Sequence, residues 1–535
     1  MKMKSVMSHS FSQVPKAEIP RSSFDRSHGY KTTFDSGYLV PFLIDEVLPG
    51  DTFNVDMTGF ARLSTPIKPL MDNMYMDTQF FAVPMRLLWA NWQKFNGEQT
   101  NPGDSTSFVI PNMVSPAGGY LNGSLEDYFG IPTQVAGLTH SCLWHRAYNL
   151  IYNQWYRDEN LQPSVYTTTG DGPDVNTNYA PLRRGKRYDY FTSCLPWPQK
   201  GAAVQIPMGT SATVKTSASN LLTGAQTSIG FLNTSGANPA TGQLLIGAGA
   251  SNANLYSSTT NSGAFAANLY PSNLYADLST ATAATINQLR QAFQIQKLLE
   301  RDARGGTRYT EIVKSHFGVT SPDARLQRPE YLGGGSSPIN IAPVAKTGST
   351  DATTPQGNLA GFGTAVLHNH GFTKSFTEHC LIIGLVSVRA DLTYQNGLDR
   401  MFSRSTRYDF YWPALSHIGE QAVLNQEIYA QGTAGGAADS NVFGYQERYA
   451  EYRYKPSRIT GQFRSNFATP LDMWHLSQKY TTLPVLGPTF IVEYPPIGRV
   501  IAVPSEPEFI FDAYIRMKCA RPMPVYGVPG LIDHF

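Results

Sequence analysis

The sequence predicts a mainly β protein, an antiparallel eight-stranded jelly roll with very long insertions that contain helices and loops. Stretches that alternate apolar and polar residues, as half-buried strands do, occur near both ends of the chain, and helical and loop-like segments lie between them. Only 15% of residues are charged and 12% are aromatic, which favours extensive burial over disorder. Early strands that pair with late ones across long connections are typical of a Greek-key jelly roll.

These patterns also predict how the chain is divided. The expected parts are a basic N-terminal arm, two halves of the jelly-roll core, two helical and loop insertions, and one exposed insertion of low charge. The arm comprises residues 1–30, and the two core halves comprise residues 31–84 and 370–535. The helical and loop insertions are residues 85–200 and 284–369, and the insertion of low charge is residues 201–283.

The N-terminal arm is polar and locally basic. This charge fits a segment that lies on nucleic acid or reaches under a neighbouring subunit, and a frayed terminus is the alternative. The candidate nucleic-acid contacts in the arm are Lys2, Lys4, Lys16 and Arg21.

The clearest strands are residues 52–63 and 509–519. In the first, Phe53 and Val55 face one side while Asn54 and Asp56 face the other. The second alternates in the same way from Phe509 to Cys519. Further strands are expected at residues 38–44, 73–82 and 379–392.

A helix followed by a basic and aromatic loop is expected between residues 144 and 191. Trp144, Tyr148, Ile151 and Trp155 recur at helical spacing and share one face. The cations of the loop are candidates for facing nucleic acid or a neighbouring subunit, and a solvated loop is the default interpretation. These cations are Arg183, Arg184, Lys186 and Arg187.

Residues 201–283 differ sharply from the rest in composition. Lys215 and Asp277 are their only charged residues, and Ser, Thr, Asn, Gly and Ala dominate. A connection of this length is usually functional or disordered, so an exposed insertion is expected, with a flexible linker as the alternative. Its candidate outward-facing aromatic residues are Tyr256, Tyr270 and Tyr275.

A second helix is expected at residues 285–304, where Gly305 and Gly306 provide the stop and Arg301 and Arg304 occupy the last turn. Residues 332–365 are rich in Gly, Ser, Thr and Pro, so a further loop is expected there.

We find no catalytic motif, and no cofactor or metal is expected. If His140, Cys142 and His145 lie on one helix, the two histidines are about 140° apart and poorly placed to share an ion. A buried thiol and a hydrogen-bonded histidine are therefore preferred. His368 and His370 would face the same side of a strand, which is a weak basis for a metal pair.

Cysteine usage and hydropathy exclude other classes of protein. The four cysteines are widely spaced, which argues against a disulfide framework and favours a reducing compartment. The N-terminus has no apolar segment like that of a signal peptide, and the aliphatic run at residues 381–386 is too short to span a bilayer.

Residues 445–463 interleave arginine and tyrosine. Aromatic rings and cations together hold single-stranded nucleic acid without reading its sequence. Tyrosine and arginine are also enriched in protein interfaces, and a subunit interface is the preferred interpretation. The candidate interface residues are Tyr449, Tyr452, Arg453, Tyr454 and Arg458.

Five blocks of the sequence carry a resemblance to one family. They read DNMYMDTQFFAVPMRLLWANWQKFNGE from Asp72, RAYNLIYNQWYRDENLQ from Arg146, PLRRGKRYDYFTSCLPWPQK from Pro181, TINQLRQAFQIQKLLERDARGGTRY from Thr285 and FGYQERYAEYRYKPSRITGQFRS from Phe443. On these five blocks taken together, the chain resembles the major capsid proteins of gokushoviruses, which are small single-stranded DNA phages of the microvirus family. The likeness covers nearly all of the chain outside residues 203–283.

This resemblance implies a viral-type jelly roll that assembles with identical subunits into a small T=1 icosahedron of sixty copies. It implies a circular single-stranded DNA genome inside, together with a small basic DNA-binding protein and a DNA pilot protein. It further implies that residues 201–283 protrude outward and meet the bacterial host surface. The expected location is the virion, after assembly in the host cytoplasm.

Two other classes of function remain open on the sequence. A β-rich secreted carbohydrate-active hydrolase would need a pair of catalytic carboxylates, and the spacing of Asp56, Asp77, Glu98 and Glu300 singles out no pair. A single-strand-binding module would use residues 445–463 and would bind with a strong salt dependence as an isolated subunit. A capsid protein would instead contact DNA in a way that depends on assembly.

Overall fold

The computed structural model describes residues 20–205, 286–320 and 327–526, together with short strands between residues 213 and 277. The chain divides into two compact units. The first comprises Met1–Pro198 and Asp302–Phe535, and the second comprises Gln199–Arg301.

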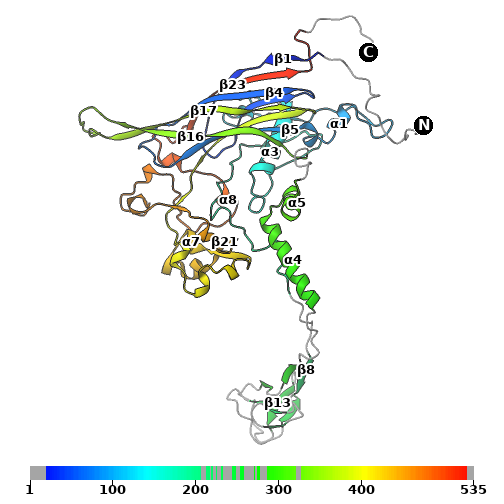
Figure 1. Ribbon diagram of the computed structural model, residues 1–535, viewed down its shortest axis with the longest axis vertical. Coiled ribbons are helices and arrows are strands. Elements are labelled where there is room, and N and C mark those ends of the chain that lie inside the picture. The colour runs from blue at the N-terminus through cyan, green and yellow to red at the C-terminus, as the bar shows by residue number, and fades with distance from the viewer. Residues whose placement is uncertain are drawn as a thin grey trace. The chain divides into compact units, whose positions relative to one another are not determined.

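The first unit is built on a curled antiparallel sheet that forms two facing layers (Figure 1). In one layer the order is β2–β23–β4–β17, and in the other it is β3–β18–β5–β16, which is the strand order of a jelly roll. Short β1 adds to β23 beside β2. The strands are β1 (Ser22–Asp25), β2 (His28–Phe34), β3 (Val40–Val47), β4 (Thr52–Leu63), β5 (Met74–Pro84), β16 (Glu330–Ala345), β17 (Leu359–Ser375), β18 (Cys380–Ala390) and β23 (Phe509–Arg521).

The main core lies between the two layers. Phe42 of one layer meets Phe511 of the other in an edge-to-face contact with ring centroids 6.0 Å apart, and Phe80 packs edge-to-face on Phe42 at 5.5 Å. Each fully buried side chain of this kind contributes about 1.5–3 kcal/mol through removal from water. The predicted eight-stranded jelly roll is confirmed, and β4 begins and ends at the residues expected from the alternation.

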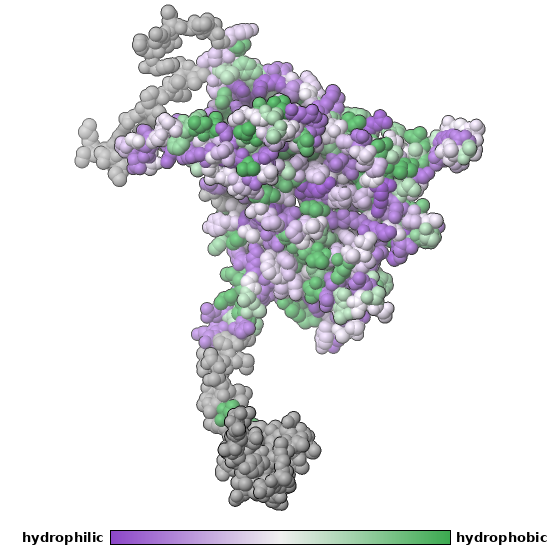
Figure 2. Space-filling view, turned by 180° about the vertical axis from the view of Figure 1, so that it is seen from behind, coloured by the Kyte–Doolittle hydropathy of each residue, from purple (hydrophilic) through white to green (hydrophobic). Residues whose placement is uncertain are grey.

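The main error in the predicted strands concerns residues 332–365. They were expected to form a loop, but they contribute most of the paired hairpin β16–β17, whose strands are 16 and 17 residues long. The expected core halves, residues 31–84 and 370–535, therefore omit β16 and most of β17. The tip of this hairpin stands clear of the sandwich, at the left in Figure 1 and at the right in Figure 2.

The outer face of the β3–β18–β5 layer is covered by residues inserted after β5. Phe81, Leu381 and Ile383 face this second core, where they pack with Tyr148 and Ile151 of α3. Because β18 is buried on both faces, it reads as a continuous aliphatic run instead of an alternating one. The elements of this layer are α1 (Trp92–Phe95), β6 (Asn112–Val114), α2 (Leu125–Tyr128), β7 (Thr139–Ser141), α3 (Leu143–Ile151) and the π-helical turn Tyr152–Tyr156.

Most of residues 391–508, which were also assigned to the core, form a lobe between β18 and β23, whereas Leu476, Ile497, Val500 and Ile501 pack in the main core. The apolar cluster of the lobe includes Tyr394, Val423, Phe443 and Phe490, together with Phe191 of the basic loop. Its elements include the hairpin of β20 (Glu420–Leu424) and β21 (Val442–Glu447), the pair β19 (Thr393–Tyr394) and β22 (Ser457–Arg458), and the short helices α7 (Asn425–Ile428) and α8 (Pro488–Ile491).

The second unit contains short antiparallel pairs of strands and most of α4. The helix α4 (Ile286–Arg304) matches the expected helix at residues 285–304, and α5 (Tyr309–Phe317) follows in the first unit. The strand pairs are β8 (Thr213–Thr216) with β15 (Leu274–Asp277), β9 (Ser219–Asn220) with β10 (Gly224–Ala225), β11 (Phe231–Leu232) with β14 (Tyr270–Pro271), and β12 (Leu244–Ala248) with β13 (Ala253–Ser257).

Candidate assembly and nucleic-acid surfaces

The basic loop folds into the protein instead of facing solvent. Arg184 is 6% exposed and donates from Nη1 to Oδ2 of Asp77 at 2.8 Å and to Oγ of Ser387 at 2.7 Å. Arg389 donates to the same Asp77 oxygen at 2.7 Å. Burial alone would raise the pKa of Asp77, but the hydrogen bond from Ser336 and the charges of the two arginines lower it below its usual value. Asp77 therefore stays ionised and pairs with Arg184 inside the protein.

Lys186 and Arg183 are held in a similar way. Lys186 is 7% exposed, and its Nζ donates to Oε1 of Gln478 at 2.9 Å. Burial lowers the pKa of Lys186 to about 8. The Arg183 guanidinium lies 4.0 Å from the ring centre of Tyr38 and 4.5 Å from that of Tyr494, within cation–π range.

Arg187 completes the loop at its outer end. It lies 4.5 Å from the ring centre of Tyr75 and pairs with Asp391 at 3.2 Å, where both charged side chains are about one-third exposed. The default interpretation of a solvated loop is wrong for Arg184 and Lys186. Because burial leaves these two side chains no surface for a phosphate, we remove them from the candidate nucleic-acid contacts. Arg183 and Arg187 are partly exposed and stay candidates.

A second buried ion pair holds α3 against the loop that follows it. Arg146 donates from Nε and Nη2 to both carboxylate oxygens of Asp174, at 2.8 and 2.7 Å. Its Nη1 donates to the carbonyl oxygens of Leu88 and Gly170, and Tyr179 donates its hydroxyl to Asp174 at 2.6 Å. The paired side chains are at most 2% exposed. The pair could not be predicted from the sequence, because a spacing of 28 residues follows no local period.

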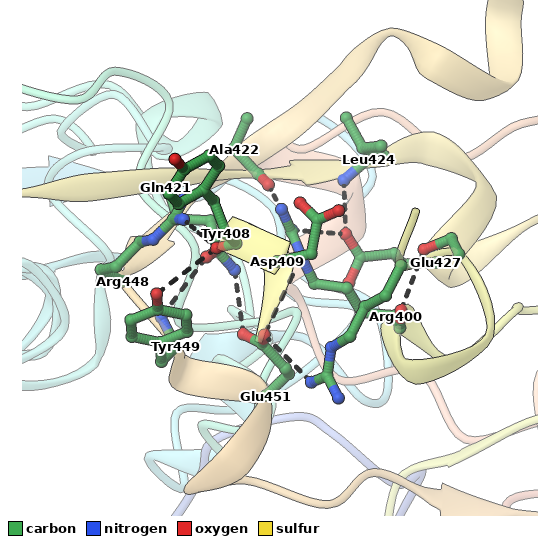
Figure 3. A network of polar contacts seen from close by, with 12 residues as sticks. Arg400, Tyr408, Asp409, Gln421, Ala422, Leu424, Glu427, Arg448, Tyr449 and Glu451 are labelled. Atoms are coloured by element: carbon green, nitrogen blue, oxygen red, sulfur yellow. Dashed lines mark hydrogen bonds and ion pairs between the residues drawn. The ribbon is translucent and has the colours of Figure 1, made fainter. Parts of the chain in front are cut away.

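A polar network fixes the predicted interface block, residues 445–463, to its own subunit (Figure 3). Arg400 donates to Oε1 of Glu427 at 3.0 Å and lies 4.0 Å from Glu451, which also pairs with Arg404 at 3.4 Å. The block is therefore an ordered part of the lobe, and Glu451 serves an internal contact.

The five candidate interface residues separate into two groups. Tyr449 is 2% exposed, so its side chain is buried within the subunit and cannot line an interface. Tyr452 and Tyr454 are each half-exposed, and Arg453 and Arg458 are exposed beside them. The surface that stays available for association is made by Tyr452, Arg453, Tyr454 and Arg458.

Comparison with known proteins decides the family. A family model described as "Capsid protein (F protein)" matches residues 12–531. The chain belongs to this family of microvirus capsid proteins. It is 50% identical to capsid protein VP1 of Bdellovibrio phage phiMH2K, with 98% of each chain covered. It is 46% identical to capsid protein VP1 of Chlamydia phage 1, with 99% of each covered, and 38% identical to that of Spiroplasma virus 4, with 98% of this chain and 97% of the relative covered.

Membership makes this chain a structural component of a virion that associates with identical subunits into a shell, and not an enzyme. The hydrolase alternative finds no support in the relatives. One of its candidate carboxylates, Asp77, is bound by two arginines inside the capsid subunit and is closed to a substrate.

The histidines near α3 are arranged differently from the expected helix. His140 lies in β7, whereas His145 lies on α3. The Nε2 atom of His140 is hydrogen-bonded to the hydroxyl of Tyr120 at 2.7 Å. The two rings stand 5.4 Å apart, and His145 faces Glu126 at 3.5 Å. Within the described residues, no group of three or more His, Cys, Asp or Glu side chains is placed to hold a metal ion.

His368 and His370 do not share one side of β17, contrary to the expectation. A bulge interrupts the pairing between Leu367 and His370, and Asn369 has a positive φ of 58°. His368 is consequently exposed, while His370 is buried, with Thr78 at 2.7 Å from its Nδ1.

The remaining candidates lie at the limits of the described structure. Lys2, Lys4 and Lys16 are outside the described residues, and Arg21 donates a hydrogen bond to Thr52 at the start of β4. In the insertion, the backbones of Tyr256, Tyr270 and Tyr275 lie in β13, β14 and β15, respectively. The structure does not describe their side chains.

All four cysteines are buried and unpaired, in agreement with the expected lack of a disulfide framework. Among the helices that the structure describes, none combines the length and the apolar character needed to cross a bilayer.

Proposed function

We propose that this capsid subunit builds a T=1 icosahedral shell of sixty copies around a circular single-stranded DNA genome, assembled in the cytoplasm of a bacterial host. The observation that carries the proposal is the full-length match to microvirus capsid proteins on a jelly roll with a projecting hairpin. A closed symmetric shell needs many complementary contacts between identical subunits. The hairpin and the exposed group at Tyr452 and Tyr454 are surfaces suited to such contacts.

The near-neutral charge of the subunit supports the proposal that another protein inside the shell neutralises most of the DNA charge. With a net charge of +2 over 535 residues, the subunit brings little charge to neutralise DNA. A small basic DNA-binding protein fits this requirement, and a DNA pilot protein is the further virion partner that we propose.

The shell is tested by sedimentation of the purified full-length protein, with electron microscopy of the same sample. Uniform spherical particles, filled with DNA when produced in the infected host, are the expected result. A protein that stays monomeric even when genome and partner proteins are supplied would contradict the proposal.

We further propose that residues 201–283 protrude from the shell and contact the host surface. Their low charge and separation into a second compact unit support this role. Deletion of residues 210–280 is expected to leave particles of normal sedimentation but to reduce attachment to host cells at least about tenfold. Attachment is measured as the fraction of particles that pellet with cells. Loss of all assembly in this deletion, or unchanged attachment, would refute a separable protrusion.

A further inference from the structure

The two layers of the jelly roll are covered unequally. The outer face of β3–β18–β5 is buried beneath α3 and its neighbours. The opposite layer contains β23, β4 and β17 (Figure 1). Its outward-facing residues are exposed in the described structure. An antiparallel sheet with one solvated face is expected to place polar residues there. This second face departs from that rule.

Four neighbouring positions carry most of the departure, and Phe362, farther along β17, is exposed as well. Phe60, Val366, Ile510 and Tyr514 point outward and are 49–61% exposed. Val366 pairs directly with Phe60, and Phe60 is diagonal to Tyr514, since it faces Asp512 across the ladder. Diagonal neighbours lie about 7–8 Å apart, within reach of aromatic side chains. Single exposed apolar residues need no explanation, but this group forms one continuous apolar and aromatic patch.

Cations surround the patch. Arg62 follows Phe60 on the outer side of β4, and Arg516 and Lys518 follow Tyr514 on β23. Lys31 lies on the neighbouring β2, where it pairs with Asp512. Together with its neighbours β1 and β2, the face holds these four cations against three carboxylates, Asp512, Asp56 and Asp25, which leaves a net charge of +1.

The first described residues lie at an edge of this sheet. The described chain enters along the same face, because β1 pairs with the Lys518–Arg521 end of β23. Arg21, just before β1, reaches Thr52 on β4.

We propose that the outer face of β23–β4–β17 binds single-stranded nucleic acid, with bases stacked on Phe60 and Tyr514 and phosphates held by Arg62, Arg516 and Lys518. The inference rests on the proposed enclosure of a single-stranded genome and identifies the surface that meets it. Aromatic platforms flanked by cations hold single strands without reading sequence, because every base presents a flat ring face. Lys31 and Arg516 already pair with Asp512 and Asp56. A purely apolar protein partner would add no counter-charge for Arg62 and Lys518.

The stacking part of the proposal is tested with the full-length subunit and a fluorescent oligothymidylate, by anisotropy across a salt series. The double variant Phe60→Ser/Tyr514→Ser is expected to bind about tenfold to a hundredfold more weakly, with an unchanged salt slope. The matched control is Tyr309→Ser/Phe317→Ser, which removes one exposed tyrosine and one exposed phenylalanine from α5. This control is expected to bind like the wild type.

The charge part has a different signature. Arg62→Gln/Lys518→Gln is expected to reduce the slope of log affinity against log salt by about 1.4, since each phosphate contact with a single strand contributes about 0.7. Equal affinity and equal slope for both double variants and the wild type would overturn the proposal.

Genome-filled particles provide a second measurement, which also applies if contact requires assembly. After ultraviolet cross-linking, nucleotide adducts are expected on peptides that contain Phe60 and Tyr514, and adducts confined to other regions would overturn the proposal. If Phe60→Ser/Tyr514→Ser blocks shell formation but leaves oligonucleotide binding intact, the face is a subunit contact and the inference fails. Shells of the wild type that never contain DNA would refute the proposed function itself.

Discussion

Replacing Asp174 with alanine is expected to destabilise the subunit by about 3–5 kcal/mol, because it leaves the buried charge of Arg146 without its carboxylate partner. Arg146 loses both of its carboxylate contacts, at 2.7 and 2.8 Å, and keeps only two carbonyl partners. Tyr179 loses the acceptor of its hydroxyl. The free energy of unfolding of the unassembled subunit, measured in urea, is the quantity to compare.

The matched control is Asp391→Ala, which removes the partner of Arg187. That pair is about one-third exposed on both sides, so solvent replaces the lost contact and the expected cost is below about 1 kcal/mol. Equal losses in the two variants would contradict the importance of burial and show that a broken ion pair has the same cost wherever it lies.

The cost of Asp174→Ala should also depend on pH. Burial alone would raise the pKa of Asp174, but the hydrogen bonds from Arg146 and Tyr179 lower it below its usual value near 3.8. A carboxylate with a lowered folded pKa stabilises the fold above its unfolded pKa and loses that contribution as the pH falls through the folded pKa. The difference in the free energy of unfolding between wild type and variant is therefore largest near neutral pH, and it becomes smaller below about pH 3.8.

Most of the sandwich could be predicted from local periodicity. Residues 52–63 and the strand that starts at Phe509 alternate strictly toward the core, and the structure places both as expected. The lobe at residues 391–508 could not be separated from the core, because an apolar residue in a lobe cluster and one in a sandwich have the same sequence signature.

The burial of the basic loop could not be predicted, for a different reason. A count of charges gives no information on burial, and the carboxylate that neutralises Arg184 lies 107 positions away in the sequence. The apolar outward residues, in contrast, did leave a signal. Phe60, Ile510 and Tyr514 interrupt the polar side of otherwise regular strands, and such exceptions identify the exposed face before the structure is known.

The glycines that predicted a loop at residues 332–365 are required by the sheet. A Cβ atom added to Gly334 would lie 2.1 Å from the carbonyl oxygen of Thr78 and 3.0 Å from Cα of Gln79, both on the paired strand β5. Backbone atoms of a central strand cannot move aside as a flexible side chain can. Glycine here permits close approach of two strands, whereas composition alone associates it with turns.

Gly334→Ala is accordingly expected to destabilise the subunit by about 3 kcal/mol or more, the upper range for overpacking, and to reduce particle yield sharply. Gly348→Ala is the control in the same hairpin, because the nearest atom to its added Cβ is the Lys346 side chain at 3.9 Å. The control should assemble like the wild type, with urea unfolding and particle yield measured for both. If Gly334→Ala folds and assembles normally, β16 does not approach β5 as closely as the pairing requires, and the hairpin would be the loop that its composition first suggested.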